Sequence, residues 1–261
     1  MELVENNDLI RSLTDMVASY MARNSQLTLN ALATRSNVPV TTLRRLMSGQ
    51  QKNEIAPHSV LNIVSYIMRE KNLATILEKA EPAISEFLRK HFGNFVFATG
   101  GKHSYDCDLN VELKDETKYL IYKLAANHNG TDYMVIAENF GGYGKKKADE
   151  MIKAGLLQEV EGRLHAREKN FSLDLSIAAQ HLPALVQFYK PGTIAQGRNS
   201  MFSMSESLCT DAIVEIKKIQ KECVMKMHAI MNNPDSFGDI PYFTINLSET
   251  MLSDTLPGDL Q

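Results

Sequence analysis

Residues 27–49 read LTLNALATRSNVPVTTLRRLMSG, and this stretch decides the fold that we expect for the first third of the chain. Apolar residues recur at helical spacing before and after Asn37-Val38-Pro39, which indicates two short helices joined by a tight turn. Ala33 is the small residue that two crossing helices need, and Pro39 suits a helix start because its missing N–H would have no partner there. The stretch therefore predicts a helix-turn-helix pair.

The same stretch lies in a uniformly positive run. No Asp or Glu occurs from residue 25 to residue 53, whereas four basic residues do, namely Arg35, Arg44, Arg45 and Lys52. A basic helix of this kind is typical of DNA contact, because it attracts the phosphate backbone. The alternative is the solvated face of a small helical bundle. The length of the run and its overlap with the second helix favour DNA.

The flanking sequence completes a bundle of about four or five helices. An amphipathic helix over residues 9–24 precedes the pair, and another follows from Pro57 onward. Residues 9–75 as a whole resemble the amino-terminal DNA-binding domain of the lambda-repressor-like, or Xre-like, regulators. The resemblance implies that the second helix of the pair lies in the major groove, where its first turns touch base edges.

Carried over by position, the resemblance implies a set of DNA-binding residues. Val40, Thr41 and Arg44 would face the bases, whereas Thr42, Arg45 and Lys52 would lie nearer the phosphates. Arg35 also belongs to this set. One position departs from the family, because Val40 stands where a Gln that reads adenine is often found. Direct readout then depends on Arg44, on Thr41 or on a thymine methyl contact, and Arg44 could instead bind phosphate.

The middle of the chain, residues 115–170, predicts a second DNA-binding module. Helical spacing marks three elements separated by Gly130 and by Gly141-Gly142, and AGLLQEVEGRLHA then alternates around a Glu161-Gly162 turn. Three helices followed by a β-hairpin is the winged-helix pattern. Its secondary DNA-binding set is Lys145, Lys146, Lys147, Arg163 and Arg167. Neighbouring acids nearly cancel this charge, so dimerisation or protein docking is an equal alternative for the module.

Between the two modules, residues 93–114 predict a short hairpin linker. Apolar residues alternate around Phe95 and Phe97, a Gly100-Gly101 turn follows, and a second apolar run ends the segment. The segment also contains metal-binding residue types at His103, Asp106, Cys107 and Asp108. Because no second matched pair accompanies them, a polar loop is the favoured interpretation, and we expect neither a metal nor a cofactor.

The last part of the chain, residues 171–261, predicts a small α/β module for dimerisation or sensing. The segment 173–189 has a helical pattern. NSMFSMSESL and PYFTINLSETML alternate like strands on either side of a long amphipathic helix from about Asp211 to Asn232. We expect the two strands to lie side by side and to bury the helix. With residues 1–92 as the first domain, the fold class is mostly α with small β elements.

The composition of the chain favours some cellular compartments over others. Residues 1–93 hold 11 Lys and Arg against 9 Asp and Glu, whereas residues 171–261 hold 6 against 10, so the amino-terminal end is the more basic one. The three cysteines are too widely spaced for a metal pair or a disulfide framework, which favours a reducing compartment. The acidic start and the absence of a membrane-length apolar run predict a cytoplasmic protein with no membrane contact.

The whole chain is similar to a family of largely uncharacterised transcription regulators from predatory and fibre-degrading bacteria. The likeness depends on LIYKLAANHNG, on AGLLQEVEGRLHA and on the two alternating segments around the long helix. No nucleophile elbow, phosphate-binding loop or dinucleotide fingerprint occurs in its required context, so we expect no enzyme. The expected function is a homodimeric regulator of double-stranded DNA. The alternative is a non-enzymatic module that keeps this fold but docks on a signalling or motility protein.

Overall fold

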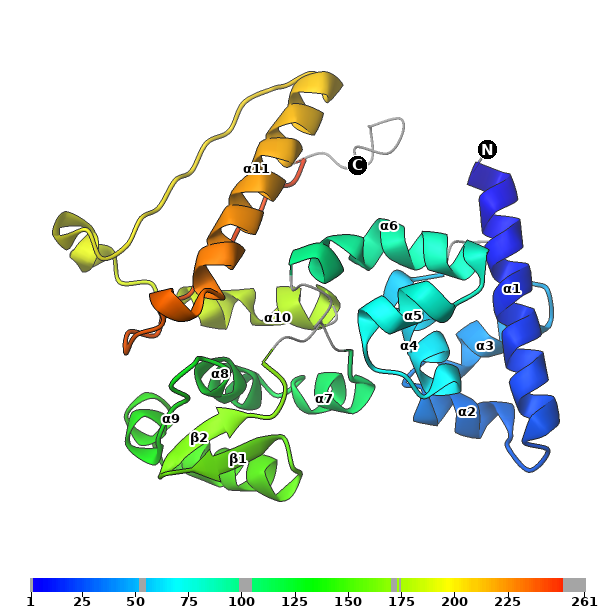
Figure 1. The fold of residues 1–261 in the computed structure, drawn as a ribbon, viewed down its shortest axis with the longest axis horizontal. Helices are drawn as coiled ribbons and strands as arrows, with labels where there is room; N and C mark the ends of the chain where they lie inside the picture. The colour runs from blue at the N-terminus through cyan, green and yellow to red at the C-terminus, as the bar shows by residue number, and fades with distance from the viewer. Residues whose placement is uncertain (1, 52–54, 99–104, 170–172, 174, 251–261) are drawn as a thin grey trace.

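A computed structural model describes residues 2–51, 55–98, 105–169, 173 and 175–250 (Figure 1). The described chain is mostly helical, with one small two-stranded antiparallel sheet. This confirms the predicted class of an α protein with small β elements. Within these residues no helix is both long and apolar enough to cross a membrane.

The amino-terminal part is a bundle of six helices around one apolar core. The helices are α1 (Glu2–Arg23), α2 (Leu29–Arg35), α3 (Val40–Met47), α4 (Pro57–Met68), α5 (Leu73–Lys79) and α6 (Pro82–Ala98). Leu13, Leu43 and Ile63 are fully buried at its centre. Burial of each such side chain stabilises the fold by about 1.5–3 kcal/mol, so this core is what fixes the helix-turn-helix pair in place.

The predicted hairpin linker over residues 93–114 is wrong, because α6 continues to Ala98 and α7 (Cys107–Glu112) follows. Ile84, Leu88 and Phe92 bury one face of α6 at intervals of four residues. Once this helix has formed, adding residues to its end needs no new nucleation, and this outweighs the strand-like alternation around residue 95. The Gly100-Gly101 turn of that prediction lies outside the described residues.

The middle part packs helices against the β-hairpin. Its elements are α7, α8 (Glu116–Ala125), α9 (Tyr133–Lys153), β1 (Leu157–Val160) and β2 (Arg163–Ala166). The strands pair from Leu157 with Ala166 to Val160 with Arg163. The turn residues between them have φ of 52° and 76°, as a two-residue hairpin requires. The predicted hairpin is therefore present.

Helix α9 is two helices joined at a break. Gly141 has φ 62° and ψ −157°, a conformation outside the helical region. The second and third predicted helices of this part thus follow each other without a loop. Thr131, just before α9, forms an isolated antiparallel bridge with Leu164 on β2, which ties the start of the helix to the hairpin. The core of this part includes Ile121, Ile136 and Leu157.

The carboxy-terminal part contains α10 (Leu175–Val186), the 3-10 helices η1 (Pro191–Gln196) and η2 (Pro234–Ser236), and the long helix α11 (Thr210–Met231). Helix α10 is anchored to the middle part, because the buried His181 donates from Nε2 to the carbonyl oxygen of Leu113 at 2.8 Å and stacks on Tyr119. Figure 1 shows residues 199–209 as an extended yellow trace that leads away from η1 to the start of α11.

The predicted strand-helix-strand arrangement is wrong in both of its strands. The helix is present, but residues 199–209 and 237–250 form no strand. A strand needs a hydrogen-bonded neighbour, and within the described chain neither segment has one. The long helix is not buried either, since none of the residues of α11 is buried.

Candidate nucleic-acid interface

The pair α2 and α3 meets at a turn whose conformation the sequence favours. Thr28 caps α2 by accepting a hydrogen bond from the backbone N–H of Ala31 at 3.1 Å. In the turn, Asn37 takes a left-handed conformation with φ 51°, which asparagine tolerates better than most residues. Val38 is 5 % exposed and fills the space between the two helices. These contacts set the angle at which α3 leaves α2.

A buried hydrogen-bond chain holds this turn from behind. Asn62 on α4 donates from Nδ2 to the carbonyl oxygen of Asn37 at 3.2 Å, and the hydroxyl of Tyr105 donates to Oδ1 of Asn62. Tyr105 itself is fixed by its backbone N–H, which donates to the carbonyl oxygen of Lys71 at 2.7 Å. Sequence reasoning missed these residues. The one available signal was a single polar residue inside the apolar run VLNIV of α4.

Helix α3 turns one face to the core and the other to solvent. Leu43 and Leu46 are fully buried. On the opposite side, the exposed residues are Thr41, Arg44 and Arg45, while Thr42 is half-buried. Val40 is also half-buried and packs against the core of the bundle, so less of it faces outward than the sequence predicted. The exposed face presents one hydroxyl and two guanidinium groups.

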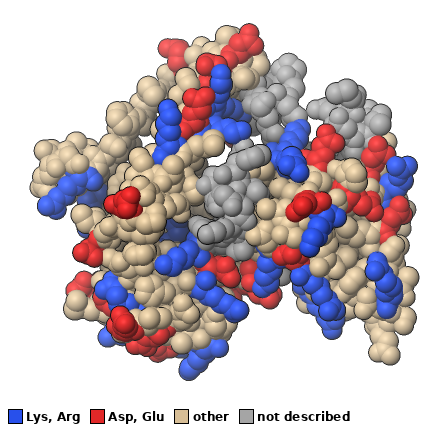
Figure 2. All heavy atoms as spheres, viewed as in Figure 1, with Lys and Arg blue, Asp and Glu red and all other residues tan. Residues whose placement is uncertain are grey.

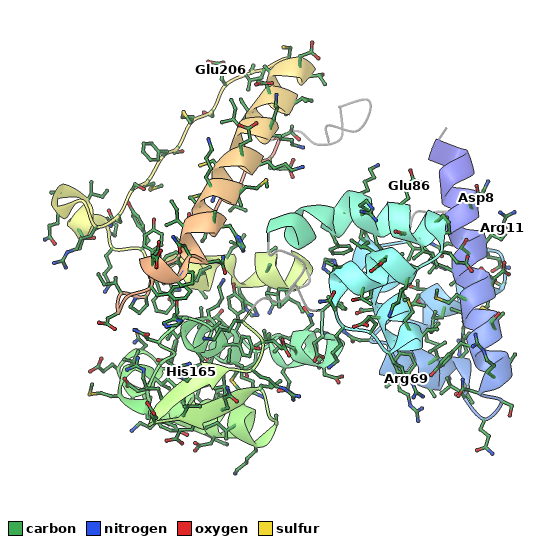
Figure 3. All side chains as sticks on the ribbon, viewed as in Figure 1. Asp8, Arg11, Arg69, Glu86, His165 and Glu206 are labelled. Atoms are coloured by element: carbon green, nitrogen blue, oxygen red, sulfur yellow. The ribbon has the colours of Figure 1, made fainter. Side chains whose placement is uncertain are left out.

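The guanidinium groups on this face have no acidic partner among the described residues. Arg44 Nη2 donates to Oδ1 of Asn30 on α2 at 3.1 Å, a neutral contact that holds the side chain across the two helices. Arg35, at the end of α2, is exposed in the same way. Arg11 on α1 differs, because it pairs with Asp8 at 3.1 Å (Figure 3). Lys52, the remaining predicted residue, lies outside the described residues.

The amino-terminal end of α3 adds positive potential to the same face. Its cap residue is Pro39, which makes no side-chain hydrogen bond to the first helical N–H groups. The unpaired N–H groups and the helix dipole favour an anion at this end. Figure 2 shows acidic and basic side chains interspersed over the face in view. By contrast, α2 and α3 contain no Asp or Glu.

The middle part does not gather its predicted cations into one surface. Lys147 turns inward, where its Nζ lies 2.8 Å from a carboxylate oxygen of Asp115 and 3.6 Å from one of Glu150. The hydrogen bond to Asp115 is the main cause that raises the pKa of Lys147. Burial raises the pKa of Asp115, but its hydrogen bonds to Lys147 and Lys118 outweigh burial and lower it. The ion pair of Lys147 with Asp115 therefore links α9 to the start of α8.

The other four cations of this set lie in separate places. Lys145 and Lys146 are exposed at the start of the second half of α9. Arg163 on β2 donates from Nε to the carbonyl oxygen of Asn129 and lies 3.9 Å from Asp132. Arg167 is exposed and comes near Gly155, past the far end of α9, which places it about 15 Å along the helix from the two lysines.

His165 lies on β2 of the hairpin (Figure 3). Partial burial lowers the pKa of this imidazole, and the nearby positive charges of Lys169 and Arg163 lower it further.

The residues considered for a metal do not form a site in the part that the structure describes. Asp106 is the cap of α7, where its Oδ1 accepts from the backbone N–H of Asp108 at 2.9 Å, and it also pairs with Lys71. No group of three or more metal-binding side chains comes together among the described residues. His103 lies outside them.

No protein-family model matches the chain, and neither a curated protein nor a solved structure matches it. The candidate interface is therefore defined by its own geometry and charge.

Proposed function

We propose that this chain is a sequence-specific DNA-binding transcription regulator that acts as a homodimer. The observation that carries the proposal is the acid-free face of α2 and α3, with exposed Arg35, Arg44 and Arg45 beside a left-handed turn. In this proposal the two short helices act as a lambda-repressor-like module, whose second helix enters the major groove. As a regulator of bacterial DNA it would act in the cytoplasm.

Each exposed residue of α3 has a role in this proposal. Arg44, held across the helices by Asn30, reads a guanine through two hydrogen bonds, and Thr41 contacts the neighbouring base. Arg45 and Arg35 bind phosphates, with Thr42 and Lys52 beside them. Val40 is limited to a methyl contact with thymine, because part of its side chain packs against the core.

A dimer is part of the proposal because one such helix reads only half of an operator. Two copies related by a two-fold axis double the contacts and read a palindromic site. The middle part, a winged-helix-like module in this interpretation, adds a phosphate contact through Lys145 and Lys146. Lys147 takes no part, since its ammonium group is paired with Asp115.

Selection of bound fragments from a random duplex library, at low and near-physiological salt, tests this function. We expect a palindromic or repeated motif. Arg44→Ala should then weaken binding to that motif by about 1–3 kcal/mol, and Arg45→Ala should weaken binding to all sequences and reduce the salt slope by about one. Arg11→Ala is the matched control, because Arg11 is also exposed but lies on α1. If nothing is enriched and all three variants bind alike, the proposal is wrong.

A second candidate is a protein-interaction module that keeps the regulator fold. The observation that favours it is the pairing of Lys147 and Arg163 with acids, which leaves the middle part with few cations free for DNA. Under this alternative the selection enriches no motif, and the Arg44→Ala variant loses a protein partner instead.

A further inference from the structure

Helix α11 leaves an apolar surface open to solvent. It has 22 residues and none of them is buried, although its sequence is amphipathic. Exposed fractions of 40 % at Ile216, 57 % at Ile219 and 63 % at Ile230 are large for isoleucine. The segments before and after α11 also expose large apolar residues, such as Phe202 at 86 % and Ile240 at 87 %. Surfaces of this kind mark sites of association.

One stripe along α11 has heptad spacing. Steps of four and three residues alternate along Ala212, Ile216, Ile219, Cys223, Lys226 and Ile230, of which Ala212 is half-buried and the other five are exposed. We refer to these six positions as the α11 seam. A seam with this spacing is what two helices use when they pack side by side with interlocking side chains.

The rest of the chain occupies other sides of the helix. Ser248 donates to Oε1 of Gln220 at 2.7 Å, and the hydrogen bonds from Thr250, with a smaller contribution from the charge of Lys217, lower the pKa of Glu249. Phe243 and Ile245 of the same segment pack on the core formed by α8 and α10. The described chain therefore holds α11 in place and leaves five of the six seam positions exposed, all except Ala212.

We propose that the α11 seam packs antiparallel against the α11 seam of a second copy of this chain. This deepens the proposed function, which includes a homodimer, but its support and its test are independent of DNA. A two-fold axis near residue 221 makes the seam self-complementary. Ile219 then faces the partner's Cys223, and Ile216 lies beside the aliphatic stem of the partner's Lys226.

Charge favours a second copy in the antiparallel direction. Lys226 is the one charged position of the seam, and the charged residues beside the seam follow in the order Asp211, Glu215, Lys218 and Glu222. An antiparallel pair sets Glu215 against the partner's Lys226 and places Glu222, near the axis, between the partner's Lys218 and the partner's Glu222. A parallel pair would instead set Lys226 against the partner's Lys226, a like-charge contact within the seam. The antiparallel pair therefore neutralises the charge of Lys226, which the parallel pair does not.

Sedimentation equilibrium of the full-length protein without DNA is the first test. We expect a reversible dimer, and Ile219→Asp should raise its dissociation constant about 100-fold, because position 219 faces the partner's Cys223 and each interface would bury two unpaired carboxylates. Val214→Asp is the matched control, since Val214 is also an exposed apolar residue of α11 but lies roughly 140° around the helix from Ile219. A wild type that stays monomeric, or two variants that dimerise alike, overturns the proposal.

Charge reversal tests the direction. Glu215→Lys alone and Lys226→Glu alone should each weaken the dimer about 3- to 10-fold, because each sets like charges together. The double variant should restore the wild-type dissociation constant. Weakening by both single changes that the double variant does not repair contradicts the antiparallel pair.

Disulfide cross-linking gives an independent check in a background with Cys107→Ser and Cys209→Ser. Adding Ile219→Cys should produce a covalent dimer on oxidation, since position 219 faces the partner's Cys223. The background alone should not cross-link, because Cys223 then faces isoleucine. Efficient cross-linking through Cys223 alone indicates a parallel pair and overturns the proposal. A dimer that passes these tests but binds no DNA motif would refute the proposed function and leave this inference standing.

Discussion

Asn62 shows how one buried amide determines the geometry of the candidate interface. It is 5 % exposed, and it joins the turn at Asn37 to Tyr105, which is 43 residues further along the chain. A buried carbonyl or hydroxyl without a partner costs about 1–3 kcal/mol. The orientation of α3 therefore depends on a side chain that cannot itself touch DNA.

We expect Asn62→Ala to lower the free energy of unfolding by about 1–3 kcal/mol, because the carbonyl of Asn37 loses this donor and the hydroxyl of Tyr105 loses Asn62 as an acceptor. Tyr105→Phe keeps the ring and should cost about 0.5–1.5 kcal/mol. Urea denaturation measures both values. Thr34→Ala, on the exposed side of α2, is the control and should change stability by less than about 0.5 kcal/mol. Equal stability of all three variants would show that the hydrogen-bond chain contributes nothing.

For single residues, the sequence predicted which side chains of α3 are exposed to solvent, but not which cations form ion pairs within the protein. Helical spacing alone places Leu43 and Leu46 on the buried face of α3, which leaves Thr41, Arg44 and Arg45 on the exposed face. Three consecutive lysines occupy positions 145–147, yet only Lys147 forms an ion pair with Asp115, which lies 32 residues earlier in the chain. Local spacing contains no information on such a distant partner.

At the scale of elements, the break in α9 depends on one backbone conformation. Gly141 combines φ 62° with ψ −157°, a region that is open almost only to glycine. Gly142 next to it lies in the helical run, and no atom lies within 4 Å of where its Cβ would be. The backbone therefore needs glycine at position 141, whereas position 142 can accept a side chain.

Substituting these glycines with alanine should separate the two effects. Gly141→Ala should lower the free energy of unfolding by about 1–3 kcal/mol, since the backbone would be strained or the break would shift. Gly142→Ala should raise it by up to about 1 kcal/mol, because alanine favours the helix. Thermal and urea denaturation give the sign of each change. A stabilising Gly141→Ala would mean that α9 is continuous in solution.

The ion pair between Asp115 and Lys147 makes the packing of α8 on α9 sensitive to pH. Because the folded protein lowers the pKa of Asp115 below its ordinary 3.8, the carboxylate stabilises the fold above that pH, and the effect is lost as the pH falls further. We expect Asp115→Asn to cost about 1 kcal/mol at pH 7, and less at about pH 3. Urea midpoints across this range measure the difference. A cost that stays constant would contradict an ionic origin.

Elements whose signals are local were predictable, and elements that need a distant neighbour were not. The helix-turn-helix pair and the β1–β2 hairpin each depend on a few adjacent residues, such as Asn37 and Glu161-Gly162. The alternating segments near residues 95 and 201–208 also have a strand pattern. The first extends an established helix, and the second has no hydrogen-bonded neighbour in the described chain. Alternation alone cannot supply that neighbour.

On the scale of the whole molecule, stability is unevenly distributed. One core lies in the amino-terminal bundle, a second in the middle part, and a small third joins α8 to α10. Helix α11 contributes no buried residue to any of them. Regions with few buried contacts open most easily, so α11 and its flanking segments are the least stable part of the monomer.

Amide hydrogen exchange should show this gradient. We expect the amides of α4 to be the slowest to exchange and those of residues 199–209 to exchange almost at once, since no backbone hydrogen bond protects the latter among the described residues. Protection of α11 should increase with protein concentration, because dimer formation covers it. The Ile219→Asp variant is the control, in which the same gain in protection should need about 100-fold more protein. Strong protection of α11 at the lowest concentration would mean that the monomer is stable there.

Tyr105 shows that the amino-terminal bundle extends further along the chain than the helix patterns indicate. Its fully buried ring belongs to the core of that bundle, although it lies thirteen residues past the end of the expected first domain at residue 92. A protein shortened to residue 92 would keep the exposed arginines of α2 and α3 but lack the Tyr105 ring that packs behind the turn. Under the proposed function, the smallest DNA-binding fragment of this chain therefore extends through Tyr105, and a shorter fragment would hold α3 less firmly.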